Sequence, residues 1–220
     1  MKLLVSGATK DVAIHTDCGI LVTPQNGNSV RKIARSGRIW AADNSAFGAW
    51  DQRKFQRMIS RIAYAGRSRF LWVACPDVVA DAPATLAKWA EWFPVLSRLG
   101  LPVAFVAQDG IEKTPDLIPW PDMVALFIGG STDWKLGPEA AGLAKRAKSL
   151  GKFVHVGRVN SERRIKHCLE IGADTVDGTG FSMFPKLIAD GLAWIDKHQI
   201  ALEPTSGFCK SARPGGACLL

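Results

Sequence analysis

The chain has 220 residues, of which 47% are hydrophobic and 22% charged. This composition excludes a disordered or fibrous protein and allows one sizeable core, so we expect one folded domain. No apolar run approaches the roughly 20 residues that span a bilayer, and the first residues lack the apolar segment and cleavage site of a secretory signal. We therefore expect a cytoplasmic protein that makes no membrane contact.

The charge is unbalanced, with 28 Lys and Arg against 20 Asp and Glu, a formal net charge of +8. Such an excess favours polyanionic partners. The five cysteines are scattered, without the spacing of a zinc site or a disulfide framework, and we interpret them as reduced structural thiols. The sequence predicts neither a metal nor a cofactor.

Eight short apolar runs predict buried strands, and four segments between them have helical periodicity. The strands are expected at 2–7, 19–24, 38–43, 69–77, 102–109, 123–130, 152–159 and 174–179, and the helices at 55–66, 84–100, 138–151 and 161–172. Each predicted helix ends at a glycine, which can adopt the left-handed conformation that closes a helix.

Alternation of apolar strands with amphipathic helices is typical of a parallel sheet covered by helices. Eight such units predict a compact (β/α)8 barrel of the TIM type, with short loops and some trimmed crossovers because the usual size is about 250 residues. A doubly wound open sheet is the alternative. The barrel is expected over residues 1–198, and the Pro- and Gly-rich residues 199–220 are expected to form a flexible basic tail.

Polar residues follow the predicted strands where a parallel barrel carries its functional side chains. The positions are Asp43, Asp77, Gln108, Asp109, Gly129, Gly130, Arg158 and Asp177. Asp43 and Asp77 would also serve as helix caps. Gln108 needs partners for its amide if it is buried. His155 is interpreted as a core histidine with satisfied nitrogens.

Three carboxylates and an amide without metal-ligand spacing suit a planar heterocycle rich in hydrogen-bond donors. A further carboxylate could attack an electrophilic sugar carbon. These residues predict base exchange or base removal.

The ordered motifs DNSAF, CPD, VAQDG, IGG and VDGT resemble those of the tRNA-guanine transglycosylase superfamily, and more closely its short phage and bacterial members that act on DNA. The resemblance implies exchange of guanine in DNA for a 7-deazaguanine base such as preQ0, through a covalent aspartyl-sugar intermediate. It implies Asp177 as the nucleophile and Asp43 as the acid/base group. Asp77, Gln108, Gly129, Gly130 and Phe47 would bind the base.

The partner implied by the resemblance is DNA with a flipped deoxyguanosine. Trp134, Lys135, Arg158, Arg163 and Arg164 would contact the nucleic acid. The zinc subdomain of the tRNA enzymes has no counterpart in this sequence, which favours DNA over tRNA. The alternatives are a tRNA-guanine transglycosylase-like enzyme, a hydrolytic base glycosylase, a non-catalytic nucleic-acid-binding barrel and an unrelated barrel enzyme that acts on a small molecule.

Overall fold

Eight parallel strands close into a barrel in the computed structural model, which describes residues 1–7, 14–26, 29–48, 50–184 and 186–202. The strands are β1 (Lys2–Ser6), β2 (Gly19–Val22), β3 (Trp40–Ala42), β4 (Phe70–Ala74), β5 (Val103–Ala107), β6 (Ala125–Ile128), β7 (Phe153–Val156) and β8 (Thr175–Asp177). Each strand pairs with the next in the sequence, and β8 pairs with β1. The predicted (β/α)8 barrel is confirmed, and the open sheet is excluded.

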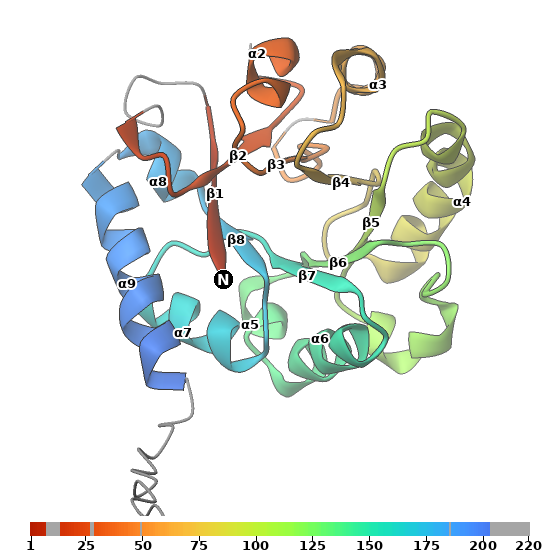
Figure 1. The fold of residues 1–220 in the computed structure, drawn as a ribbon. Coiled ribbons are helices and arrows are strands. Elements are labelled where there is room, and N and C mark those ends of the chain that lie inside the picture. Colours follow the sequence, from red (N-terminus) through yellow and green to blue (C-terminus); the bar gives the residue numbers. More distant parts are fainter. Residues whose placement is uncertain (8–13, 27–28, 49, 185, 203–220) are drawn as a thin grey trace, which may run out of the picture.

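Helices surround the ring of strands (Figure 1). They are α2 (Val30–Ala34), α3 (Gln52–Ala65), α4 (Ala82–Arg98), α5 (Thr132–Lys135), α6 (Pro138–Ser149), α7 (Glu162–Glu170), α8 (Thr179–Met183) and α9 (Lys186–Leu202). The β5 to β6 connection is short and contains only the 3₁₀ turns η1 (Ile111–Lys113) and η2 (Pro115–Leu117). Trimmed crossovers of this kind explain how the barrel fits in so short a chain.

Helix α9 continues to Leu202, beyond the predicted domain limit at residue 198. Residues 203–220, most of the predicted tail, lie outside the described residues. Within the described parts of the chain, no helix combines the length and the apolarity needed to cross a bilayer.

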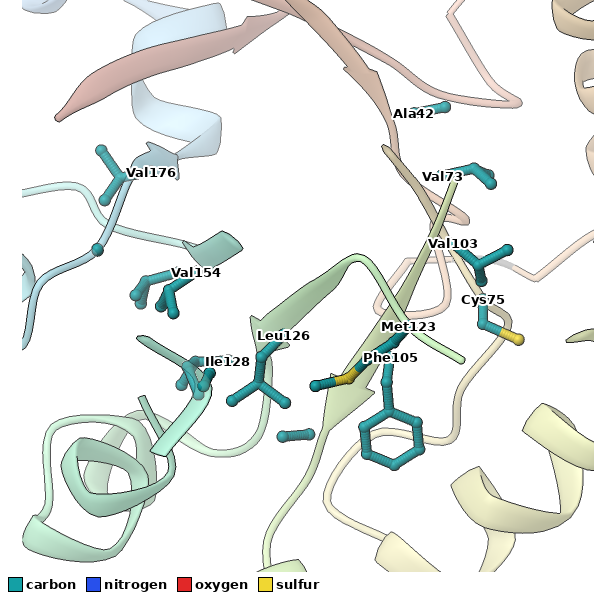
Figure 2. Packing of buried hydrophobic residues seen from close by; sticks show 14 of the residues in the cluster. Ala42, Val73, Cys75, Val103, Phe105, Met123, Leu126, Ile128, Val154 and Val176 are labelled. Carbon is teal, nitrogen blue, oxygen red and sulfur yellow. The ribbon is translucent and has the colours of Figure 1, made fainter. Parts of the chain in front are cut away.

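Alternate residues of the strands face two different layers. Leu4, Leu21, Trp72 and Phe127 point into the barrel, together with the alanines of neighbouring strands. Residues such as Val73, Phe105 and Leu126 instead join the layer between the strands and the helices, part of which is drawn in Figure 2 from Ala42 round to Val176. Because both faces are buried, the strands are mostly apolar, as the sequence pattern indicated.

The helices begin at their own capping residues. Asp51 accepts a hydrogen bond from the Lys54 N–H at the start of α3, and Asp81 accepts one from the Ala84 N–H at the start of α4. Asp43 and Asp77 precede these caps in the sequence, so neither caps the following helix. Both carboxyl groups are therefore left at the ends of their strands, beside the mouth of the barrel.

Candidate active site

A cavity of about 310 Å³ lies at the carboxyl end of the barrel. The predicted residues that line it are Asp43, Phe47, Asp77, Gln108, Gly129, Gly130, Arg158 and Asp177. They come from the ends of β3 to β8 or the loops that follow. Asp43 and Asp177 lie 134 positions apart in the sequence and line the same cavity, as expected of residues at the carboxyl ends of barrel strands.

Asp77 is held from two sides by amide groups. Asn44 Nδ2 donates to its Oδ1 at 2.7 Å, and Gln108 Nε2 donates to its Oδ2 at 2.6 Å. Burial raises the pKa of Asp77 to about 6, although these two hydrogen bonds and the nearby Arg158 lower it. Both donors are 2% exposed, so the direction of this carboxyl group is fixed before any ligand arrives.

The side-chain amide of Gln108 also makes hydrogen bonds within the protein. Its Oε1 accepts hydrogen bonds from the N–H groups of Ala80 and Gly130, both at 2.9 Å. Gln108 orients Asp77 and connects the loops that follow β4, β5 and β6. Its Nε2 has a second N–H that takes no part in this network, so the predicted contact of Gln108 with a ligand stays a prediction.

Gly129 and Gly130 leave room for neighbouring side chains, and their N–H groups already donate hydrogen bonds within the protein. The Gly129 N–H donates to Ala107 O, and the Gly130 N–H donates to Gln108. A Cβ atom at Gly129 would approach Gln108 Nε2 to 2.7 Å, and one at Gly130 would approach Asp109 Oδ2 to 2.7 Å. These positions are glycine because neighbouring side chains pack directly on the backbone.

Asp177 is the last residue of β8. Its Oδ1 accepts from the Arg158 backbone N–H at 3.2 Å and lies 3.3 Å from His155 Nε2. The other ring nitrogen of His155 lies 2.8 Å from Thr175 Oγ1. His155 is fully buried with both nitrogens engaged, as expected of a core histidine, but its contact with Asp177 makes it part of the site.

Asp43 occupies the most unfavourable electrostatic position. Its Oδ2 accepts a hydrogen bond from the Ser45 N–H at 3.0 Å. Burial, followed by repulsion from Asp177 and Asp77, raises the pKa of Asp43 from 3.8 to about 7. At neutral pH this carboxyl group therefore exchanges a proton readily, as a general acid or base must.

The one cation that lines the cavity among the described residues is Arg158. Its guanidinium donates to Gly130 O and lies over the ring of Phe47, 4.1 Å from the ring centroid. Phe47 is 65% exposed. Together these two side chains form the polar and aromatic rim of the cavity.

The other residues expected to contact nucleic acid do not line the cavity. Lys135 is 1% exposed, and its Nζ donates to Gly157 O at 2.7 Å, while burial lowers its pKa to about 7. Trp134 donates to Glu112 at 2.9 Å, and Arg164 donates to Arg158 O. Arg163 is exposed on α7. Lys135 in particular has no access to a phosphate, because it serves as an internal donor.

Sequence reasoning missed part of the site. Asn44, which holds Asp77, is not among the predicted site residues, and neither are Thr23, Gln25 and Asn26, which line the cavity from the loop after β2. The same strand-end rule could have found this loop, since it follows an apolar strand. At Gly178, which follows Asp177, a Cβ atom would collide with Asn160 Oδ1, so packing within the protein requires a glycine there.

The described residues include no group of three or more Cys, His, Asp and Glu placed to hold a metal ion. The cavity offers carboxyl groups in different environments, a fixed hydrogen-bond acceptor in Asp77 and a guanidinium at the rim. Such a set can bind a ligand that carries N–H or O–H donors and can move protons on it.

Comparisons with known proteins support the fold. No family model and no curated protein matches the chain. A solved structure described as "Native KDPGal structure" is similar with 12% identity and a TM-score of 0.57, over 91% of this chain and 95% of that one. A chain of the tryptophan synthase α2β2 complex from Pyrococcus furiosus is similar with 14% identity and a TM-score of 0.55, over 90% and 95%.

These comparisons correct the resemblance to the transglycosylases. The similar structures are described as KDPGal and tryptophan synthase, not as transglycosylases, and no family match supports the tRNA-guanine transglycosylase superfamily. The predicted exchange of guanine in DNA, and its partners DNA and a 7-deazaguanine base, are therefore wrong. The physical reason is that the short motifs mark strand ends, which any barrel of this kind fills with polar residues and glycines.

Proposed function

We propose that this barrel is an enzyme that catalyses proton transfer on a small molecule, with Asp43 and Asp177 as the catalytic residues. The observation that carries the proposal is the presence of both carboxyl groups in one cavity, in environments that differ. The cavity is small, about 310 Å³, and so suits a metabolite. The similar barrels, both enzymes of small metabolites, support this size of substrate.

The two carboxyl groups have separate roles in this proposal. Asp43, whose pKa is raised to about 7, carries a proton that it donates to the substrate. Asp177, whose Oδ1 is held by the Arg158 N–H and His155, accepts a proton from the substrate through its other oxygen. Donation and acceptance at opposite atoms of one molecule drive isomerisation, or cleavage of a bond next to a carbonyl group.

Asp77 would recognise the substrate rather than react with it. Its two oxygens are fixed by Asn44 and Gln108, and each keeps a lone pair for a further donor. The substrate is therefore expected to carry an amine, amide or hydroxyl group at the end that enters the cavity. Arg158 and Phe47 would cover this group from the rim.

The test is solvent isotope incorporation. The protein is incubated in D2O with pools of polar metabolites, and mass spectrometry identifies compounds that gain deuterium or are converted. We expect wild type to label at least one compound, with Asp43→Asn and Asp177→Asn each reducing the rate about 10²-fold or more. Asp190→Asn, an exposed position on α9, is the matched control and should keep the full rate.

Two results would contradict the proposal. One is that no compound in any pool is labelled or converted by wild type. The other is that the Asp177→Asn protein labels the same compound as fast as wild type. If Asp43 donates the proton, activity should also fall as the pH rises through about 7, because the acid form is lost.

A further inference from the structure

A groove of cationic side chains lies beside the cavity. Lys54, Arg57 and Arg61 lie three and four residues apart on α3, so they share one face of the helix. They face the loop after β2, and the groove between them is also lined by Thr23, Gln25 and Asn26. Helices α2 and α3 are neighbours on the outside of the barrel at this place (Figure 1).

The positive charge of this groove is poorly compensated. Asp51 lies 3.8 Å from Lys54, but within the described ranges no carboxylate pairs with Arg57 or Arg61. Arg31 and Arg53 line hollows that share Arg61 with the groove. Much of the excess positive charge of the chain is thus concentrated on one surface, where an anion would be attracted.

The groove adjoins the proposed catalytic cavity. Thr23, Gln25 and Asn26 line both hollows, so a molecule that occupies the cavity can extend over this loop to α3. The cavity is lined by three carboxyl groups, whereas the groove is lined by three cations. A ligand that fits both has hydrogen-bond donors at one end and negative charge at the other.

We infer that the groove of Lys54, Arg57 and Arg61 is a phosphate-binding subsite for the tail of the substrate. The inference rests on the proposed function and deepens it, since it defines the substrate class as phosphorylated small molecules with a donor-bearing head. A phosphate group suits the groove better than a carboxylate does, because its oxygens accept from several cations at once. The polar loop side chains after β2 supply further hydrogen-bond partners.

Calorimetry with inorganic pyrophosphate as the probe tests the subsite. We expect wild type to bind one pyrophosphate per chain, and Arg57→Gln/Arg61→Gln to bind it about tenfold more weakly. The control Lys145→Gln/Arg163→Gln removes the same charge from exposed positions on α6 and α7 and should bind like wild type. Asp43→Asn and Asp177→Asn should also bind pyrophosphate like wild type, so that loss of activity and loss of this subsite are separate results.

Three outcomes would overturn the subsite. The first is that wild type does not bind pyrophosphate, and the second is that the groove and control variants weaken pyrophosphate binding equally. The third is that a single-stranded oligonucleotide binds much more tightly than pyrophosphate and that both double variants weaken its binding alike. Equal weakening would mean that pyrophosphate responds only to net charge. Once a substrate is known, the groove variants should raise its KM about tenfold and leave kcat nearly unchanged, because the subsite lies away from Asp43 and Asp177.

Discussion

Asp43 and Asp77 show how neighbours determine what an aspartate can do. Both are drawn from the same sequence context, a carboxylate after an apolar strand, and both have raised pKa values through burial. Asp77 has two amide donors, whereas Asp43 has only backbone N–H donors and faces Asp77 and Asp177. The sequence places these residues correctly, but their partners come from other strands and could not be predicted.

Asp43→Asn should change how stability depends on pH. The pKa of Asp43 is raised in the folded protein, so folding favours the protonated form, and the contribution of Asp43 to stability falls as the pH rises from 3.8 to about 7. Asparagine keeps an oxygen for the Ser45 N–H but does not titrate. We expect the variant to gain about 2 kcal/mol relative to wild type between pH 5 and pH 8.

Urea denaturation at several pH values measures this difference. The exposed substitution Asp190→Asn is a suitable reference. A difference between Asp43→Asn and wild type that stays constant with pH would show that Asp43 is ionised throughout this range.

Gln108→Leu should destabilise the protein through its backbone partners. The change leaves the Ala80 and Gly130 N–H groups without an acceptor and removes a donor from Asp77. We expect a loss of about 2–5 kcal/mol, measured by urea denaturation, because the buried Gly130 N–H loses its acceptor, which costs about 1–3 kcal/mol, and the carboxyl group of Asp77 loses a donor. The exposed Gln52→Leu serves as control, and a loss below about 1 kcal/mol for Gln108→Leu would contradict the network.

The helices that bury much apolar surface could be predicted from the sequence, and the short ones could not. Helices α3, α4, α6 and α7 lie where periodicity placed them, and Gly66, Gly100, Gly151 and Gly172 have positive φ at their ends. The short elements α2, α5 and α8 carry too few apolar residues for a period to be detected. The two 3₁₀ turns between β5 and β6 are equally short.

Gly130, in the loop after β6, is constrained more strongly than Gly142 on α6. Gly130 has φ of 62°, and a Cβ there would meet Trp134 and Asp109. Gly130→Ala should cost about 2–3 kcal/mol in thermal or urea denaturation. By contrast, Gly142→Ala on α6 meets open space and should stabilise the protein by about 0.5–1 kcal/mol. Equal effects of the two substitutions would contradict this explanation.

The interior of the barrel is filled by a few large side chains among small ones. Trp72 is fully buried within the barrel, near Ala41, Ala74, Ala104 and Ala125, with its ring centroid 5.6 Å from that of Phe127 and 4.7 Å from that of His155. This complementarity of large and small residues is a property of the closed barrel and is invisible in any single strand.

Trp72→Ala should therefore cost about 3–5 kcal/mol, as expected for a large cavity in a core. Urea denaturation measures the loss, and Tyr64→Ala, at a position 91% exposed, should change the stability by less than about 0.5 kcal/mol. Because Trp72 touches His155, the substitution should also lower activity. A nearly neutral Trp72→Ala would mean that the interior of the barrel is not packed as described.

The sequence predicted the closed barrel, and the structure brings the predicted strand-end residues together in one cavity, but the predicted guanine exchange is wrong. The alternation of strands and helices is a property of the whole chain, and it predicted the closed barrel. The family resemblance relied on motifs of three to five residues, each at a strand end, and one fold hosts many unrelated functions. The comparisons, which extend over nine tenths of the chain, point to other barrels.

The hydrogen bonds of Gln108 have a consequence for how a ligand arrives. They join the loops after β4, β5 and β6 through Asp77, Ala80 and Gly130, so this half of the mouth behaves as one rigid wall. The loops after β2 and β3 carry the exposed residues Gln25 and Phe47. We therefore expect substrates to enter and products to leave the cavity beside the loops after β2 and β3.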